Sequence, residues 1–294
     1  MSASDLEARR RFFAEELEAV CGLRSPALVE AFASVPRERF LPPGPWDVLS
    51  VADYTPMAVP PPRKTPDGDP RRVYHNIGIA IDASRRLFNG HPATLAQWID
   101  LLDLRAGAHV LHVGSGTGYY SGIVAHAVGA EGRVVAIEVD DRLAAAARTN
   151  LADFPWVDVR HGNAAGPFDE SFDAILINAG VTHARDEWLD ALNPGGRMML
   201  PLTCSMSGSD TIGKGFVMLV TRVEDWFEVR PVTIVAIYSA IGVRDDALNA
   251  PLADAMRRQP FPPLMRLRRD RHEVSDSCWM HGPTVCWSRS DRSA

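Results

Sequence analysis

Residues 109–122 have the sequence His-Val-Leu-His-Val-Gly-Ser-Gly-Thr-Gly-Tyr-Tyr-Ser-Gly, in which an apolar run ends in three alternating glycines. Residues compatible with a helix follow, from Tyr119 to Val128. This order predicts a strand, a tight loop and a helix. Glycine suits such a loop because the chain turns sharply and a Cβ atom would keep a ligand away from the backbone. The next predicted strand, 133–139, carries an acidic residue, Glu138, at its end.

The glycine-rich loop and Glu138 together indicate a nucleotide site. Glu138 follows Gly118 by about 20 residues, the distance at which an acidic side chain reaches a ribose hydroxyl in a nucleotide-binding βαβ unit. A dinucleotide fingerprint, G-x-G-x-x-G, requires glycine at position 119, where this chain has Tyr119. The observed G-x-G-x-G pattern is typical of S-adenosylmethionine-dependent methyltransferases, whose ligand has no pyrophosphate. A glycine-rich turn without a ligand is the third interpretation, and the ordered strand, loop and acidic strand end count against it.

The composition fits an α/β protein and does not favour a nucleic-acid partner. With 294 residues, 46% of them hydrophobic, the chain can form one large α/β domain with additions or two small domains. Acidic residues outnumber basic ones, 37 to 31, whereas nucleic-acid-binding proteins usually have a basic excess or a basic face. The arginines at 257, 258 and within 266–271 are interpreted as a solvated surface segment.

The cysteines and the apolar runs suggest a cytoplasmic protein without a membrane partner. Four cysteines are scattered along the chain and predict reduced thiols rather than a disulfide framework: Cys21, Cys204, Cys278 and Cys286. Near the C-terminus, His272, Cys278, His281 and Cys286 have spacings that match no common zinc pattern, so ordinary packing and no metal site are expected. No apolar signal region begins the chain, and no run of about 18 apolar residues predicts a transmembrane helix.

Apolar periodicity and turn residues predict the other elements. Helices are expected over residues 4–22, 26–33, 92–102, 142–151 and 185–192, with Ser25 as the N-cap of the second. Strands are expected over 157–160, 172–180, 197–202, 216–223 and 229–237, an extended segment over 73–81, and an irregular proline-rich loop over 55–72. Repeated strand–helix units followed by a hairpin predict a doubly wound, Rossmann-like α/β sheet with an antiparallel edge.

Over roughly residues 25–235 the chain resembles the protein-L-isoaspartate O-methyltransferase family of class I methyltransferases. The residues that carry the resemblance are Val35-Pro36-Arg37-Glu38-Arg39-Phe40, residues 113–119, the strand ending at Glu138, Arg160-His161-Gly162, Phe172-Asp173-Ala174-Ile175, Gly195-Gly196-Arg197 and Leu200-Pro201-Leu202. The first of these is the most specific, since many methyltransferases share the others. We expect an N-terminal helical and loop element on the substrate side (1–91), a cofactor-binding core (92–240) and, beyond the resemblance, a C-terminal appendage (241–294).

The same resemblance implies S-adenosyl-L-methionine as the cofactor and assigns roles by position. The glycines of the loop would line its methionine part, and Glu138 would bind both ribose hydroxyls. Asn163 stands where the family usually has an aspartate near the adenine amino group; its amide oxygen can accept the same hydrogen bond, and a strand-end turn residue is the alternative interpretation. The full set expected at the cofactor is Val113, Gly114, Ser115, Gly116, Gly118, Tyr119, Glu138, Val139, Asn163, Ala164 and Asn178.

The acceptor side departs from the family. The family has a Gly-Gln-Thr-Ile-Ser-type loop whose serine lies near the isoaspartyl carboxylate, and Gly90 stands at that serine position when Pro92 anchors the comparison. An upstream Tyr-x-Asp element is Tyr74-His75-Asn76 here, without its acid. Repair of isoaspartyl residues is therefore doubtful, and a relative that methylates another acceptor fits better.

Three residues are candidates near the acceptor. Asn89 and His91 are placed there by the resemblance, and His183 follows a predicted strand at the edge where such sheets bind ligands. Either histidine could act as a base, although surface or packing roles are also open. A carboxylate of a peptide or protein is the first hypothesis for the acceptor. A small-molecule tailoring methyltransferase and a cofactor-binding protein without catalysis are the alternatives.

Overall fold

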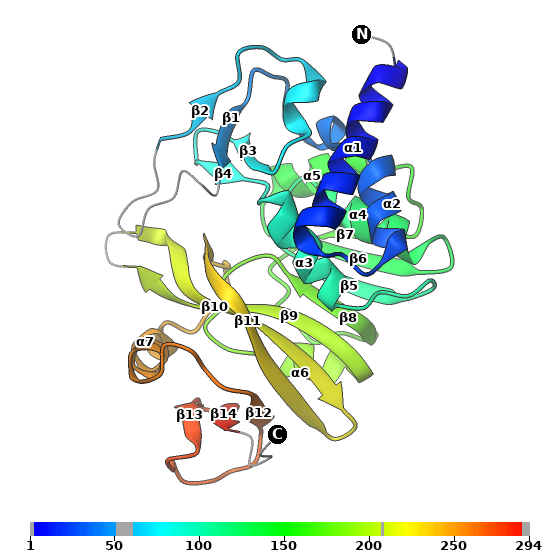
Figure 1. Cartoon of the computed structure of the whole chain (residues 1–294). Coiled ribbons are helices and arrows are strands. Elements are labelled where there is room, and N and C mark those ends of the chain that lie inside the picture. Colours follow the sequence, from blue (N-terminus) through cyan, green and yellow to red (C-terminus); the bar gives the residue numbers. More distant parts are fainter. Residues whose placement is uncertain (1–2, 51–60, 207–208, 290–294) are drawn as a thin grey trace. The chain divides into compact units, whose positions relative to one another are not determined.

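The computed structural model describes residues 3–50, 61–206 and 209–289, which form two compact units. Unit 1 comprises the residues up to Ala108 together with Ser115–His161, and unit 2 comprises His109–Gly114 together with the residues from Gly162 onward. Figure 1 labels the elements along the chain. The three segments expected from the sequence, 1–91, 92–240 and 241–294, are defined by their role at the site and not by compactness. That division remains a prediction.

Unit 1 begins with the expected helices. They are α1 (Ala3–Cys21), α2 (Pro26–Ser34) and α3 (Pro92–Leu101). Ser25 caps α2 as predicted, since its side chain accepts a hydrogen bond from the N–H of Leu28 at 3.3 Å. The buried rings of Phe13 and Phe32 meet edge to face between α1 and α2, which lie side by side in Figure 1.

A small antiparallel sheet lies where the sequence predicted only an extended segment and an irregular loop. Its strands are β1 (Asp47–Ser50), β2 (Arg63–Lys64), β3 (Ile77–Asp82) and β4 (Leu87–Phe88), in the order β2-β1-β3-β4. The predicted loop over 55–72 is therefore wrong for part of its length, because β2 and the 3₁₀ helix η3 (Pro70–Val73) occupy it; residues 55–60 lie outside the described residues. Strands this short have no periodic pattern to detect.

A buried arginine holds the N-terminal part of unit 1 together. Arg37, in the 3₁₀ helix η1 (Arg37–Phe40), is fully buried. Its guanidinium donates hydrogen bonds to the backbone carbonyls of Val73, His75 and Ile77, at 2.6, 3.0 and 2.7 Å. Because a buried charge is costly unless it is hydrogen-bonded, Arg37 and these carbonyls together hold in place the segment that leads into β3.

The rest of unit 1 follows the predicted alternation. It consists of α4 (Tyr119–Val128), β6 (Arg133–Glu138), α5 (Asp141–Asn150) and β7 (Val157–His161). Strands β6 and β7 pair in parallel, with Glu138 opposite His161. Asp140 caps α5 through its side chain. These elements place Glu138 at the carboxyl end of a parallel strand, the edge at which open α/β sheets bind ligands.

Unit 2 contains parallel strands that continue into a long antiparallel region. Strand β8 (Phe172–Ile177) pairs in parallel with both β5 (His109–Val113) and β9 (Leu192–Met206). The helix α6 (Asp186–Ala191) precedes β9, which begins earlier than predicted and includes residues 193–196. Strands β10 (Ser209–Val223) and β11 (Trp226–Tyr238) form the expected antiparallel hairpin, and β10 also pairs with β9 (Figure 1).

The C-terminal residues extend this sheet rather than forming a separate body. After η4 (Asp246–Leu248) and α7 (Asn249–Arg258), strand β12 (Met265–Arg268) pairs with β11, and β14 (Cys286–Arg289) lies between β12 and β13 (Cys278–His281). The α/β fold class is thus the expected one, and the appendage contributes its outermost strands. Among the described residues, no helix is both long and apolar enough to span a membrane.

Candidate cofactor site

The carboxylate of Glu138 is fixed by the backbone around it. Its Oε2 accepts a hydrogen bond from the N–H of Gly116 at 2.7 Å, and its Oε1 accepts one from the N–H of Asp140 at 3.0 Å. The side chain is buried, with 7% of its surface exposed. A carboxylate oxygen can accept more than one hydrogen bond, so both oxygens retain capacity for a ligand hydroxyl.

The loop itself leaves room where a side chain would stand. Gly116 has a φ of +57°, in the left-handed region, and a Cβ atom there would lie 3.3 Å from Cδ1 of Ile81. Thr117 anchors the loop because its hydroxyl donates to the carbonyl of Phe40 at 2.6 Å, and Ser115 donates its N–H to Ile137 at 3.2 Å. A rigid backbone with a missing Cβ fits the close approach that a methionine moiety requires.

Three other candidates of unit 1 lie on the same elements. Gly118 is the N-cap of α4, and Tyr119 begins that helix with its side chain buried, which raises its pKa well above the ordinary value. Val139 directly follows Glu138, and its carbonyl lies 3.1 Å from Nε2 of His161. Tyr119 therefore belongs to the packing beneath the loop, where a neutral phenol is the stable form.

In unit 2, three candidates meet at the carboxyl ends of two parallel strands. The N–H of Asn178 donates to the carbonyl of Val113 at 2.8 Å. A Cβ atom on Gly114 would lie 3.3 Å from the carbonyl oxygen of Asn178. The two strand ends, those of β5 and β8, are therefore neighbours, as the expected site requires.

Asn163 and Ala164 form a turn after β7. The side-chain oxygen of Asn163 accepts the N–H of Ala165 at 3.1 Å, which is an Asx turn and matches the alternative interpretation given to this residue. Ala164 has a φ of +56°, and its carbonyl accepts the indole N–H of Trp188 at 3.0 Å. The turn is thus held in place, and contact of Asn163 with an adenine remains a prediction.

The candidates near the acceptor have structural partners. Asn89 is buried, and its side-chain oxygen accepts from the N–H of Ile79 at 3.1 Å and from Arg37 at 3.4 Å. Asn76 accepts the N–H of Ala93 at 2.9 Å, at the first turn of α3, and an aspartate could do the same. His91 is the residue before α3 and is half-buried. Through these contacts Asn89 helps to hold β3, and Asn76 helps to hold the first turn of α3. Catalysis by Asn89 or His91 stays a prediction.

His183, in unit 2, is half-buried and close to a hydroxyl. Its Nδ1 lies 3.1 Å from Oγ1 of Thr182. Burial lowers the pKa of the imidazole, and the charge of Arg185 lowers it further. A base must be neutral to accept a proton, so these effects keep His183 in the competent form at pH 7. A catalytic role for His183 remains a prediction.

Gly90 lies in a conformation that disfavours a serine. Its φ is +81°, and a Cβ atom would approach Cδ2 of Leu95 to 3.0 Å. We expect Gly90→Ser to lower the free energy of unfolding by about 1–3 kcal/mol, measured by thermal and urea denaturation. Gly107→Ser is the matched control, because Gly107 has the same φ of +81° and its nearest neighbour to a Cβ, the carbonyl of Glu131, is 4.0 Å away. Equal losses in both variants would show that Leu95 does not crowd position 90.

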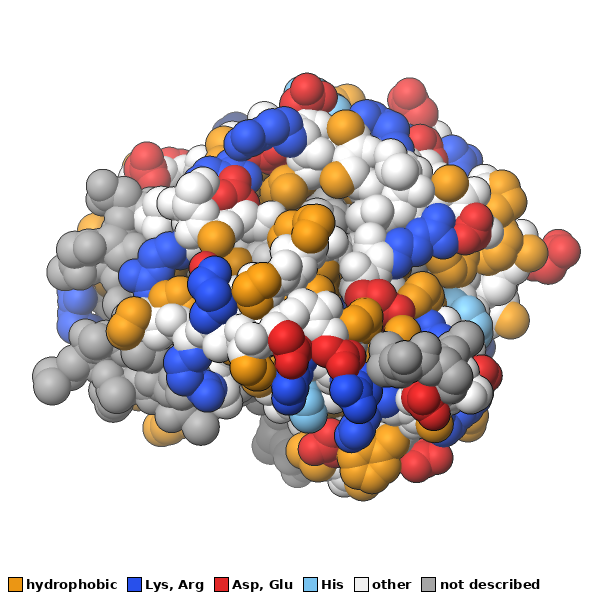
Figure 2. Space-filling view, turned by 90° about the horizontal axis from the view of Figure 1, so that it is seen from above, with side chains coloured by type: hydrophobic (Ala, Val, Ile, Leu, Met, Phe, Trp, Pro, Cys, Tyr) orange, Lys and Arg blue, Asp and Glu red, His pale blue; other side chains and the backbone are white. Residues whose placement is uncertain are grey.

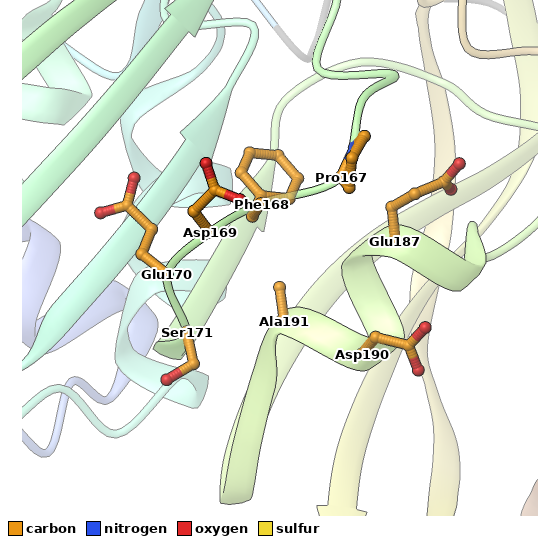
Figure 3. Close-up of a pocket in the computed structure, with 8 residues that line it drawn as sticks. All are labelled: Pro167, Phe168, Asp169, Glu170, Ser171, Glu187, Asp190 and Ala191. Atoms are coloured by element: carbon orange, nitrogen blue, oxygen red, sulfur yellow. The ribbon is translucent and has the colours of Figure 1, made fainter.

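A shallow hollow in unit 2 lies at the wrong end of the sheet for a cofactor. Figure 3 shows its walls, residues 167–171 before β8 and Glu187, Asp190 and Ala191 of α6. Ligands of open α/β sheets bind at the carboxyl ends of strands, whereas this hollow adjoins the amino end of β8. Two of its acidic groups are also paired, Glu187 with Arg185 at 2.9 Å and Asp190 with Arg269 at 2.5 Å.

The fold and the glycine-rich loop define a class I S-adenosylmethionine-dependent methyltransferase. Comparison with known families narrows this class. The family model "Protein-L-isoaspartate(D-aspartate) O-methyltransferase (PCMT)" matches residues 62–214, and the chain belongs to this family. A protein-L-isoaspartate O-methyltransferase of Methanopyrus kandleri is 32% identical over 200 residues, covering 66% of this chain and 76% of the relative. One of Methylorubrum extorquens is 31% identical over 245 residues, covering 81% and 92%.

Solved structures agree on the fold. A protein-L-isoaspartate O-methyltransferase structure has a TM-score of 0.61 at 21% identity and covers 83% of this chain and 69% of that one. A structure described as the Plasmodium falciparum member, in complex with S-adenosyl-L-homocysteine, has a TM-score of 0.58 at 15% identity and covers 79% and 97%. The family model and the relatives of about 30% identity confirm the family expected from the sequence.

Proposed function

We propose that this methyltransferase esterifies a carboxylate of a peptide or protein, and that the carboxylate is not that of an isoaspartyl residue. The observation that carries the second part is Gly90, which has no hydroxyl, has a φ of +81° and is crowded by Leu95. Asn76, where the family has an acid, is engaged with the first turn of α3. Of the two positions that would receive an isoaspartyl group, one therefore lacks the hydroxyl and the other is hydrogen-bonded within the protein.

The residues of the cofactor side fit S-adenosylmethionine. The ligand supplies a methyl group on a positively charged sulfur. The loop from Ser115 to Gly118 would hold the amino-acid part against the backbone, and Glu138 would accept hydrogen bonds from the ribose. The protein contributes mainly orientation, since an in-line displacement needs its reactants held about 3 Å apart. An acceptor carboxylate is ionised at pH 7 and needs no base, so the reaction does not depend on a histidine.

The surface gives no reason to prefer a nucleic-acid acceptor. In Figure 2, Lys and Arg side chains alternate with Asp and Glu over the face that is shown, and among its described residues neither sign dominates. A nucleic-acid groove requires a continuous basic surface to neutralise phosphates. A peptide or protein acceptor is therefore the better candidate.

The decisive experiment measures methyl transfer from labelled S-adenosylmethionine. With a standard isoaspartyl peptide we expect less than about 1% of the turnover of a genuine repair enzyme, because loss of one charged hydrogen bond costs about 1.5–3 kcal/mol and the loop is otherwise changed. Turnover comparable to that of a repair enzyme would refute the acceptor assignment.

A second measurement identifies the bond that is formed. The protein is incubated with labelled cofactor and a peptide library, and the products are treated with alkali. Methyl esters release methanol, so volatile label supports a carboxylate acceptor. Stable label would indicate another acceptor chemistry, and methylation confined to small molecules would favour the tailoring function instead. Binding of S-adenosyl-L-homocysteine without turnover on any acceptor would leave a cofactor-binding protein.

A further inference from the structure

Four metal-ligating side chains come together at the end of unit 2. One ligand atom from each of His272, Cys278, His281 and Cys286 lies within 4.8 Å of the other three. The residues belong to the orange and red segment of Figure 1, on and before β13 and β14. Their spacing, H-x5-C-x2-H-x4-C, differs from the usual zinc patterns, so the fold must account for the arrangement.

A bulge in β13 places Cys278 and His281 on one face. In a regular strand, residues three apart point to opposite faces. Here the register shifts between Cys278 and Met280, so that Cys278 pairs with Ser288 whereas His281 pairs with Cys286. The extra residue restores a common face for Cys278 and His281. Cys286 is the direct cross-strand neighbour of His281, at a distance from which both can reach one ion.

His272 covers this face from the preceding loop, and its ring is oriented for binding. Its Nδ1 lies 2.9 Å from the carbonyl oxygen of Asp270. Because a carbonyl can only accept, Nδ1 carries the proton and Nε2 presents its lone pair. That Nε2 lies 3.7 Å from Sγ of Cys278. Metal-binding histidines are typically held by such a hydrogen bond from the other ring nitrogen.

Two of the other groups, His281 and Cys278, also have surroundings that suit metal ligands. Nδ1 of His281 is buried, and the described residues offer it no hydrogen-bond partner. A buried nitrogen without a partner costs free energy, which coordination would remove. Sγ of Cys278 accepts the backbone N–H of Ser275 at 3.5 Å, a contact that stabilises a thiolate.

We infer that His272, Cys278, His281 and Cys286 form a structural Zn²⁺ site. Two thiolates and two imidazoles are the ligands that zinc takes in closed tetrahedral sites. Zn–S and Zn–N bonds of about 2.3 and 2.0–2.1 Å separate the ligand atoms by roughly 3.3–3.8 Å. The 3.7 Å between His272 and Cys278 already matches, and the widest pair, at most 4.8 Å, needs side-chain rotations of about 1 Å.

The site would stabilise the outermost strands. Strands β12, β13 and β14 have four residues each, and residues 269–277 between β12 and β13 contain no helix or strand. Strands of this length are marginal alone. A metal would tie the loop to the β13–β14 hairpin through His272. Since all four positions are taken by protein ligands, no position remains for a reacting water.

The test is the metal content of tag-free protein purified without chelator. Mass spectrometry of the metals is expected to find about one zinc per chain. Replacement of the metal with Co²⁺ should produce the absorption of a tetrahedral ion together with thiolate charge-transfer bands. This measurement uses the native sequence, so it does not depend on whether variants fold.

Variants assign the ligands. Cys278→Ser and His272→Ala are each expected to lower the zinc content at least fivefold, to below about 0.2 per chain. Cys204→Ser, the same exchange at a cysteine of unit 2 outside the cluster, should retain about one zinc. Binding of S-adenosyl-L-homocysteine is measured on the same samples, so that a failed cofactor assignment and a failed metal assignment are distinguished.

Three results would overturn the site. One is native protein that contains no zinc and takes up neither Zn²⁺ nor Co²⁺. Another is unchanged zinc content in Cys278→Ser. The third is thiol titration that finds Cys278 and Cys286 joined as a disulfide.

Discussion

Replacing Gly116 with valine is expected to abolish measurable binding of S-adenosyl-L-homocysteine, with a loss of affinity greater than about 100-fold, or about 2.8 kcal/mol. Gly116 has a φ of +57°, which a β-branched residue rarely adopts. Its Cβ would lie 3.3 Å from Ile81, and the valine methyl groups would extend into the space expected for the methionine moiety. The N–H of Gly116 also donates to Glu138, so a shifted loop would disturb both parts of the site. Isothermal titration calorimetry measures the effect.

Gly129→Val separates this effect from backbone strain. Gly129 lies in the same unit with a φ of +71°, it follows α4, and a Cβ there would meet nothing within 4 Å. This variant is expected to lose stability by about 1–2 kcal/mol and to keep its affinity for the ligand. Unchanged affinity in Gly116→Val, with the protein folded, would defeat the cofactor assignment. Equal losses of affinity in both variants would assign the effect to strain.

Replacing Glu138 with alanine is expected to weaken binding of S-adenosyl-L-homocysteine by about 10- to 150-fold, which corresponds to about 1.5–3 kcal/mol for a charge-assisted hydrogen bond. The carboxylate is buried and fixed by the N–H groups of Gly116 and Asp140. The variant therefore loses the group expected at the ribose and also the acceptor that positions the loop. A lower thermal midpoint should accompany the lower affinity, because two backbone donors lose their partner.

Glu138→Gln and Asp141→Ala complete the experiment. Glutamine can accept from only one of the two N–H groups with its oxygen, and its NH₂ group would face the other, so an intermediate loss is expected. Asp141 is an exposed acid in the first turn of α5, directly after the N-cap residue Asp140, and its removal should change affinity less than twofold. A loss below twofold in Glu138→Ala would remove Glu138 from the cofactor site.

The sequence alone determined the class and the family of this protein. The G-x-G-x-G loop lies between an apolar run and a helix, and Glu138 follows at a strand end. This is a local signal, because the turn residues and the apolar periodicity of a βαβ unit lie in consecutive residues. The structure confirms this order in β5, α4 and β6. It also confirms the antiparallel hairpin of β10 and β11, whose short connection left one pairing available.

Contacts between distant residues decided what the sequence could not. The N-terminal sheet depends on two-residue strands that have no pattern of their own, and Arg37 satisfies its charge with carbonyls 36 to 40 residues away. The roles of Asn76 and Gly90 likewise depend on α3, through Ala93 and Leu95. Absence of a family residue is visible in the sequence, whereas what its replacement contacts is not.

The cysteine and histidine cluster shows the same division most clearly. Its spacing matches no common zinc pattern, so the sequence predicted ordinary packing and no metal site. The zinc site that we propose depends instead on the bulge between Cys278 and Met280 and on the contacts of His272 with Asp270 and Cys278. A sequence specifies periodicity directly, but a one-residue shift in strand register depends on the pairing of whole strands. Register is therefore the property that only the tertiary structure fixed.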